Sequence, residues 1–268
     1  MSSEDVEDNL DLDDVDMAIA LLQRDFPTVA VPHVPRVVLR TQLYSVVKNR
    51  TRVDMRLARL GSLGRVRTVL LFKGASTDDL AVLDVAEFRA ALERLLEAKP
   101  TSEPPELDRR FDARVKRARV EPSRAESALR LFARDVCRLT SSEPRISVVA
   151  LRAALRTSAE PDALSDAELE ACVQRLVECG ALVAADSQNF FWAIPNGGVF
   201  LKALLQGRKE LVAVLRRSKF KEVAQKVLEQ RPLKTCQLGW QFLLRDGIGS
   251  DAIYAVPISG DVLLRAAT

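Results

Sequence analysis

Apolar residues repeat along the chain with two different periods, and the order of these periods predicts helices alternating with close pairs of strands. Apolar positions that recur every three, four or seven residues predict amphipathic helices. Short β-branched and aromatic runs, joined in pairs by polar loops, predict antiparallel hairpins. The predicted helices occupy residues 15–26, 41–47, about 51–61, 87–98, 125–139, 149–156, 165–180, a long stretch from 198, about 220–230 and 240–245. The predicted strands occupy residues 37–40, 66–73, 80–85, a short segment at 146, 181–185, 190–194, 234–238, 252–257 and 262–265.

Helices followed by a hairpin occur three times, which predicts an α+β fold, mainly α with small β hairpins, built as a tandem of three winged-helix domains. A parallel sheet also alternates helices with strands, but short loops between paired strands favour antiparallel wings. Thr41 is the expected N-cap of the second helix, and Ser165 with Glu168 forms a capping sequence. We expect a disordered acidic tail at 1–14, winged-helix domains at 15–98, 125–197 and 198–268, and a basic, Pro-containing linker at 99–124.

Charge is distributed unevenly along the 268 residues. The chain carries 40 Lys and Arg against 37 Asp and Glu, a net charge of +3. Residues 1–16 contain eight acids and no Lys or Arg, so the rest of the chain has a net charge of +11. A basic body with an acidic tail suits a protein that binds a polyanion while limiting non-specific adhesion, although plain disorder explains the tail equally well.

The stretch 198–234 concentrates the positive charge, with ten cations against three acids. Lys202, Lys209 and Arg216 lie seven residues apart, so they share one face if the helix continues through Gly207. They would then span roughly 21 Å at about 1.5 Å per residue, the reach of several phosphates along a duplex. A solvated helix face is the alternative. The cluster at 216–221, which has few acids near it, favours nucleic-acid binding.

Two other basic segments have competing interpretations. The linker at 99–124 fits a nuclear import signal, an auxiliary nucleic-acid arm or a solvated charged helix. Arg50, Arg52, Arg56 and Arg59 lie on the helix that occupies the usual reading position of a helix-turn-helix. Surface arginines that flank a hydrophobic core are the favoured interpretation of these four.

The sequence argues against catalysis, metal binding and membrane insertion. No apolar run approaches the roughly 18 residues of a membrane span, and the acidic N-terminus is unlike a secretory signal, so we expect an intracellular protein. Four cysteines without CxxC spacing indicate reduced thiols, and the single histidine, His33, lies in a proline-bounded loop. The Gly-rich loop, HRD-type catalytic loop and DFG motif of protein kinases are absent. We therefore expect a non-enzymatic protein without a cofactor or metal.

Motifs near both ends of the chain resemble the serine/threonine-protein kinase 19 family. They are VVLRTQLYSVV at 37–47 with Asn49-Arg50-Thr51, FWAIPNGG at 191–198, Gly207-Arg208, Arg216-Arg217, Lys219-Phe220, the turn at 246–249 and GDVLLR at 260–265. The resemblance covers roughly residues 15–268 and is weakest in the linker and the second module. It implies, despite the family's name, a nuclear winged-helix protein that binds DNA and takes part in transcription-coupled nucleotide excision repair.

The resemblance also implies a site and partners. The family's DNA-binding residues align with Lys202, Arg216, Arg217, Lys219 and Arg231, and Arg208 and Lys221 complete the candidate set. The implied partners are double-stranded DNA and the stalled RNA polymerase II repair assembly, including the Cockayne syndrome A protein and a repair helicase of the XPD type. The acidic tail departs from the basic run found there in the family, so nuclear import would need another signal, such as 109–119. A protein-interaction scaffold whose basic face meets an acidic partner is the alternative function.

Overall fold

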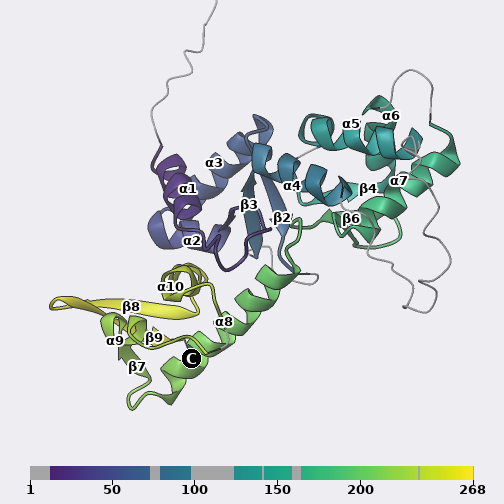
Figure 1. Cartoon of the computed structure of the whole chain (residues 1–268). Coiled ribbons are helices and arrows are strands. Elements are labelled where there is room, and N and C mark those ends of the chain that lie inside the picture. The colour runs from purple at the N-terminus through teal and green to yellow at the C-terminus, as the bar shows by residue number, and fades with distance from the viewer. Residues whose placement is uncertain are drawn as a thin grey trace, which may run out of the picture. The chain divides into compact units, whose positions relative to one another are not determined.

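A computed structural model describes residues 13–72, 79–97, 124–140, 142–158, 164–234 and 236–267. Within them, three three-stranded sheets repeat one topology, in which the first strand lies beside the last strand of a hairpin. The sheet orders are β1-β3-β2, β4-β6-β5 and β7-β9-β8 (Figure 1). Each set of strands is interleaved with helices in the same order, so the chain has the predicted α+β fold with winged-helix repeats.

The first repeat follows the predicted order closely. Its elements are α1 (Asp14–Arg24), β1 (Val37–Leu39), α2 (Arg40–Val46), α3 (Arg50–Ser62), β2 (Val66–Leu70), β3 (Leu80–Asp84) and α4 (Val85–Glu97). The predicted N-cap Thr41 is wrong, because α2 begins one residue earlier and Leu39 is its cap. The Gln42 side chain accepts a hydrogen bond from the Leu39 amide at 3.1 Å, which leaves the Thr41 hydroxyl for another contact.

The second repeat comprises α5 (Arg124–Leu139), β4 (Arg145–Ser147), α6 (Val148–Ser158), α7 (Asp166–Glu178), β5 (Leu182–Ala184) and β6 (Asn189–Trp192). Ser165 and Glu168 form the predicted capping box of α7. The core here contains Trp192, whose ring stacks on Phe132 and meets Phe88 edge to face. Arg67 is buried beside the Phe88 and Trp192 rings, and its guanidinium donates to the Thr140 hydroxyl.

The third repeat comprises α8 (Gly198–Arg217), β7 (Glu222–Ala224), α9 (Gln225–Glu229), α10 (Trp240–Gly249), β8 (Ile253–Ile258) and β9 (Asp261–Ala266). Two predictions are wrong in this repeat. The helix predicted at 220–230 begins only at Gln225, because residues 222–224 form a strand that pairs with β9. Residues 234 and 236–238 are not a strand, since β7 already occupies the first-strand position of the sheet.

The chain divides into two compact units. One contains residues 1–27, 38–58 and 203–268, and the other contains residues 28–37 and 59–202. One boundary falls in the loop after α1, and the other three fall within β1, α3 and α8. The acidic segment 1–12, the linker predicted at 99–124 up to residue 123, most of the polar loop at 74–79 and the Cys137 side chain lie outside the described residues. None of the helices in the described ranges is long and apolar enough to cross a membrane.

Candidate nucleic-acid interface

Helix α8 carries most of the predicted basic site, and it is one continuous helix from Gly198 to Arg217. Gly207 is buried within it, and a Cβ there would lie within 2.7 Å of the Leu243 and Cys236 side chains. Close packing against these residues therefore accounts for a glycine in mid-helix. Because the helix does not break, the seven-residue spacing of Lys202, Lys209 and Arg216 places these three exposed cations along the same side of α8.

The turn after α8 presents a second group of cations. The Ser218 hydroxyl donates to the Leu215 carbonyl at 2.6 Å, and the Lys221 amide donates to the Ser218 carbonyl at 3.0 Å. Lys221 adopts a φ of 57°, a left-handed conformation that residues other than glycine rarely take. The turn exposes Lys219, Phe220 and Lys221 to solvent, and the Lys219 ammonium lies 5.3 Å from the Phe220 ring centre.

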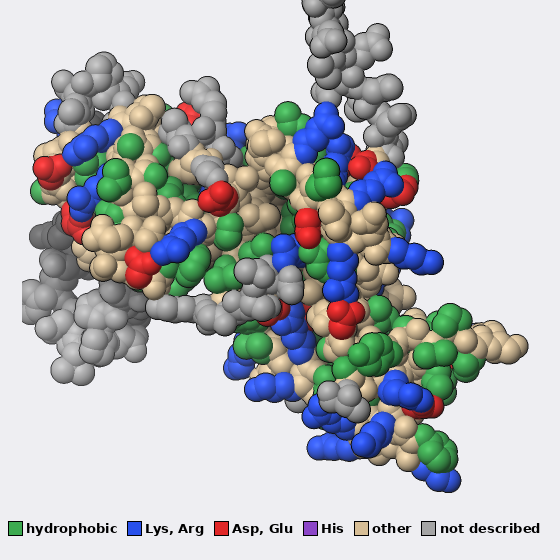
Figure 2. Space-filling model, turned by 180° about the vertical axis from the view of Figure 1, so that it is seen from behind, with side chains coloured by type: hydrophobic (Ala, Val, Ile, Leu, Met, Phe, Trp, Pro, Cys, Tyr) green, Lys and Arg blue, Asp and Glu red, His purple; other side chains and the backbone are tan. Residues whose placement is uncertain are grey.

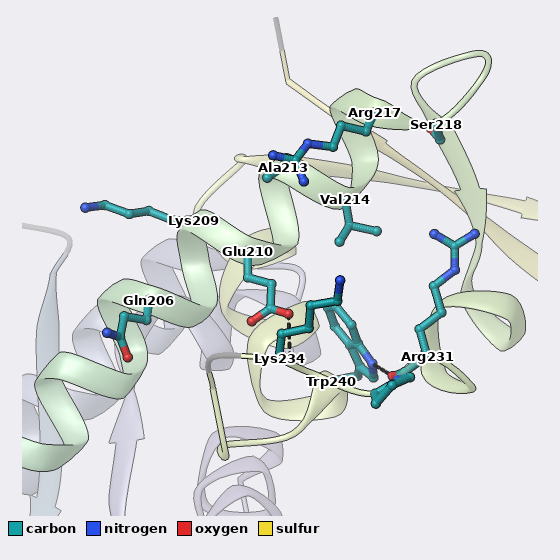
Figure 3. A pocket seen from close by; sticks show the side chains of 11 residues that line it. Gln206, Lys209, Glu210, Ala213, Val214, Arg217, Ser218, Arg231, Lys234 and Trp240 are labelled. Atoms are coloured by element: carbon teal, nitrogen blue, oxygen red, sulfur yellow. Dashed lines mark hydrogen bonds between the residues drawn. The ribbon is translucent and has the colours of Figure 1, made fainter.

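A groove of about 810 Å³ lies beside the C-terminal half of α8 (Figure 3). The loop after α9 forms its other wall and is held by two hydrogen bonds. The Trp240 indole N–H donates to the Arg231 carbonyl at 2.6 Å, and the Lys234 amide donates to Glu210 Oε1 at 2.7 Å. These bonds hold the loop that carries Arg231 and Lys234 across the groove from Arg217. Residues from α8 and from the loop after α9, which are distant in sequence, therefore line the same groove.

The structure brings most of the predicted site together. Arg217 and Arg231 line the groove, while Arg216, Lys219 and Lys221 lie on the last turn of α8 and the turn that follows. Lys202 lies on the first turn of α8 and belongs by its contacts to the other compact unit.

Six of the seven predicted cations share an electrostatic property. Within the described residues they form no ion pair, and all are exposed: Lys202, Arg216, Arg217, Lys219, Lys221 and Arg231. Figure 2 shows Lys and Arg side chains, with few acids, gathered over the part of the molecule formed by α8 and the elements after it. These charges are available to an external anion.

Arg208, the seventh predicted residue, has a different environment. Its Nε and one Nη donate to the two oxygens of Asp246 at 2.7 and 3.0 Å. Asp246 is 1% exposed, and it also accepts a hydrogen bond of 2.7 Å from the Thr41 hydroxyl. A buried carboxylate needs such partners, since an unpaired charge in the interior is strongly destabilising. Arg208 therefore holds α8, α10 and α2 together.

Helix α10 occupies the usual reading position of the third winged helix, but it is packed against α2. The Gln42 side-chain amide donates to the Phe242 carbonyl at 3.1 Å, and Thr41 contacts Asp246 as described. A Cβ at Gly249 would collide with the Thr41 carbonyl, so the two helix backbones approach as closely as glycine permits. The reading face of α10 is consequently buried within the protein.

Three of the four arginines of α3, the reading-position helix of the first winged helix, are neutralised by nearby acids, whereas Arg59 is exposed and has no ion pair within the described residues. Arg52 pairs with Asp13 and Asp14, and Arg56 pairs with Asp16. Arg50 donates to both oxygens of Asp251. Between these arginines, the apolar residues Val53, Leu57 and Leu60 are buried as predicted. The pairing supports the interpretation of these arginines as structural surface residues.

The described titratable groups provide no evident nucleophile or metal cluster. Burial raises the pKa of the Cys172 thiol to about 11, and burial also raises the pKa values of the Cys179 and Cys236 thiols. Such thiols stay protonated at neutral pH and are poor nucleophiles. No group of three or more His, Cys, Asp or Glu within the described ranges is placed to hold a metal ion.

The predicted site omits three residues of this surface, Lys234, Trp240 and Phe220. The periodicity predicts Lys234 in a strand, Trp240 at the start of a helix and Phe220 inside a helix. Phe220 is 74% exposed, which is unusual for a large aromatic side chain. The sequence does contain one indication that Phe220 is exposed, namely its position between Lys219 and Lys221. Neither neighbour in sequence offers an apolar side chain for the ring to pack against.

Comparison with known proteins identifies the family. The family model described as "Inactive serine-threonine protein kinase 19" matches residues 22–256. The chain belongs to this family. It is 24% identical to the mouse protein named winged helix repair factor 1 over 232 residues, which cover 86% of this chain and 76% of the mouse protein. The human protein of the same name is 23% identical over the same shares of the two chains. A Dictyostelium discoideum protein of that name is 33% identical over 96 residues, which cover 36% of this chain and 25% of that protein.

The family assignment confirms three of the predictions. It confirms the resemblance, and the relatives' name agrees with the winged-helix topology of the three sheets. The family description calls its members inactive, in agreement with the missing kinase motifs, and the chain is a non-enzymatic protein. The names of the relatives place the family among repair-related winged-helix proteins.

Proposed function

We propose that the protein binds double-stranded DNA through the end of α8, the turn after it and the adjoining groove wall. The observation that supports this most strongly is a set of cations that have no acidic partner in the described part of the chain: Arg216, Arg217, Lys219, Lys221 and Arg231. Lysine and arginine side chains on such a surface neutralise phosphates and release condensed counterions, which drives sequence-independent binding.

The surface is suited to contact phosphates rather than bases. Base reading requires an element inserted into a groove of the duplex, usually a helix. None of the three reading-position helices is suited to this within the described structure. Helix α10 packs on α2, three of the four α3 arginines pair with aspartates, and α7 carries four acids against one arginine. The cations then position the protein on DNA without specifying a sequence. Arg208 supports this surface by its bond to Asp246 and is not expected to contact DNA itself.

The test is binding of a fluorescent duplex to a triple variant, Arg216→Glu, Arg217→Glu and Lys219→Glu. We expect affinity to fall at least 100-fold, because three phosphate contacts are replaced by repulsion. In the unaltered protein, about five contacts predict a slope of log affinity against log salt of roughly −4.5. The matched control is a second triple variant with the substitutions Lys48→Glu, Arg130→Glu and Arg134→Glu. It changes the net charge by the same amount at exposed cations that lie outside the site. Equal affinity of the two triple variants would refute the DNA assignment.

On this proposal the protein works in the nucleus as an adaptor in transcription-coupled nucleotide excision repair. The repair factor name of its relatives supports the repair context. Its expected partners are the stalled RNA polymerase II assembly with the Cockayne syndrome A protein and a repair helicase of the XPD type. Co-precipitation of these proteins with the chain after transcription-blocking damage, and not before, is the corresponding measurement.

A scaffold that binds an acidic protein partner through the same cations is the second candidate. The observation that favours it is the apolar floor of the groove beside α8, which a phosphate backbone does not require. Binding of an acidic partner that the three charge reversals abolish, without duplex binding by the unaltered protein, would favour the scaffold, whereas salt-sensitive binding to any duplex would favour DNA.

A further inference from the structure

The groove beside α8 is built for more than phosphates. Its floor is formed by Ala213, Val214, Pro232 and Trp240, and its volume of about 810 Å³ lies within the range of sites that bury a ligand. A duplex backbone contacts such a surface only at its charged rim, so the apolar floor stays in water when DNA binds. An occupant with apolar side chains would remove this surface from water.

The rim of the groove carries four cations and one acid. Lys209, Arg217, Arg231 and Lys234 line it, with the Lys209 side chain extending outward, and Glu210 already accepts a hydrogen bond from the Lys234 amide (Figure 3). Within the described residues the four cations have no acidic partner. The chemistry of the groove therefore fits an acidic peptide that also carries apolar side chains.

The chain contains one segment of this composition. Residues 1–12 hold five acids and no Lys or Arg: Glu4, Asp5, Glu7, Asp8 and Asp11. Three branched apolar residues, Val6, Leu10 and Leu12, are interspersed among them. The segment therefore complements both properties of the groove. Its acids have the opposite charge to the cations at the rim, and its apolar side chains suit the apolar floor.

The segment is long enough to reach the groove. The described chain begins at Asp13, which pairs with Arg52 at 2.8 Å, and Arg50, two residues away, pairs with Asp251 at 2.7 Å. Asp251 follows the C-terminus of α10, and Trp240 at the groove begins that helix, roughly 15 Å away along its axis. Twelve extended residues span up to about 40 Å, which leaves about 25 Å for the stretch from Asp13 to Asp251, where two ion pairs join the neighbouring residues Arg52 and Arg50 to Asp13 and Asp251.

We propose that residues 1–12 dock in the groove beside α8 of the same chain and compete there with duplex DNA. The docking part of the proposal depends only on the lining of the groove and on the composition of residues 1–12. The competition rests on the proposed function, because Arg217 and Arg231 are shared between the two ligands. A duplex then has to displace the segment before it gains those contacts.

Zero-length carbodiimide cross-linking of the full chain, read by mass spectrometry, tests the docking directly. The reagent joins carboxylates to lysine amines in contact, so we expect links from the acids at 4–11 to Lys209 and Lys234. Lys48 and Lys202 are exposed reference lysines that should link at least five-fold less. Even labelling of all four lysines, or links confined to Lys48, would overturn the proposal. An equal mixture of ¹⁴N and ¹⁵N protein would overturn docking within one chain if mixed-isotope links dominate.

Two further variants test whether apolar contacts between the segment and the groove floor contribute to docking, in addition to general charge attraction. Val6→Ser with Leu10→Ser keeps every charge, and Val214→Gln makes the half-buried floor polar without touching a cation. Each should reduce the links to Lys209 and Lys234 several-fold, and unchanged links would mean that charge alone attracts the segment, contrary to the proposal. Circular dichroism of Val214→Gln checks that the fold is intact.

Duplex affinity tests the competition. Replacing the five acids by their amides, Glu4→Gln, Asp5→Asn, Glu7→Gln, Asp8→Asn and Asp11→Asn, should raise duplex affinity about ten-fold at low salt. Unchanged affinity, with the cross-links of the unaltered protein in place, would overturn the competition. If the cross-links form but no variant binds a duplex, the docking is supported and the DNA function fails, so the two failures are distinguishable.

Discussion

Two basic regions in one compact unit have opposite electrostatic environments. On α3, Arg50, Arg52 and Arg56 are each paired with aspartates of α1 or of the turn after α10. At the end of α8, Arg216 and Arg217 and the lysines of the next turn form no ion pair with described residues. The count of cations is similar, so the difference lies in which charges the fold itself neutralises.

The proposed function would have this winged-helix protein bind DNA without its reading helices. Both helices at the reading position serve the interior of this unit, α3 through ion pairs with α1 and α10 through its packing on α2. Unneutralised cations of the described residues cluster on the last turn of the first helix of the third repeat and on the turn after it. Phosphate contacts tolerate this geometry, because they need charge and exposure but no insertion into the groove of the duplex.

Gly249→Ala should have the largest effect, because it forces α10 away from α2. The added Cβ would collide with the Thr41 carbonyl, and backbone cannot rotate aside as a side chain can. We expect a loss of about 3 kcal/mol or more in the free energy of unfolding, measured by urea denaturation. Gly198→Ala is the matched control, since nothing lies within 4 Å of a Cβ there. If both variants have the same stability, the close contact between α2 and α10 is not present in solution.

Reversing the charge of a paired arginine should mainly lower the stability of the fold, whereas reversing the charge of an unpaired arginine should mainly lower duplex affinity. Arg56→Glu places an acid beside Asp16 and Asp13, with side chains only about 20% exposed, and should cost roughly 1–2 kcal/mol of stability. Arg217→Glu removes no ion pair with a described residue and should leave the melting temperature nearly unchanged. Duplex affinity should respond in the opposite order, with a loss of ten-fold or more for Arg217→Glu alone. A DNA defect in Arg56→Glu at a temperature where it is fully folded would contradict the assignment of α3 as structural.

The sequence predicted the charge of the site better than its geometry. Periodicity located α8, and the local count of cations located the cluster at 216–221, because both are properties of neighbouring residues. Arg208 looks identical in that count, and only the contact with Asp246, 38 residues later, distinguishes it. The groove escaped prediction for the same reason, since Lys234 and Trp240 reach it through a loop whose path depends on long-range packing.

Strand β7 shows where periodicity misleads. The strand has only three residues, too few to show the alternation of buried and exposed side chains. Because α9 follows it directly, the sequence pattern of the two elements together predicts one helix. The partner strand β9 decides the conformation, because its backbone groups pair with Glu222, Val223 and Ala224. Tertiary pairing here overrides local propensity.

Lys221→Gly should have a smaller effect and isolates one phosphate contact. Lys221 has a φ of 57°, which glycine adopts without strain, so the substitution should keep or slightly raise the melting temperature. Loss of a single phosphate contact should lower duplex affinity about two- to five-fold and flatten the salt slope by roughly 0.9. Lys226→Gly is not an equivalent control, because its ammonium bonds the Gly260 carbonyl, so Lys48→Gly in an exposed turn serves instead. An unchanged salt slope would remove Lys221 from the site.

The smallest expected effect is a pH dependence of the paired region. Arg245 on α10 donates to Asp25 at 2.9 Å, and this bond, opposed by partial burial, holds the pKa of the Asp25 carboxyl below its ordinary value. A lowered folded-state pKa means that the stabilisation is present above the unfolded-state value near 3.9 and is lost as pH falls through the folded-state value. Asp25→Asn should therefore reduce stability at pH 7 by less than about 1 kcal/mol, and the difference between the two proteins should shrink as pH falls through the folded-state pKa of Asp25. Duplex affinity should be equal for both at pH 7, because the Asp25 pair belongs to the neutralised region and not to the cations of α8. A difference in unfolding free energy that does not shrink at all as the solution is acidified from pH 7 would show that Asp25 acts through something other than its charge.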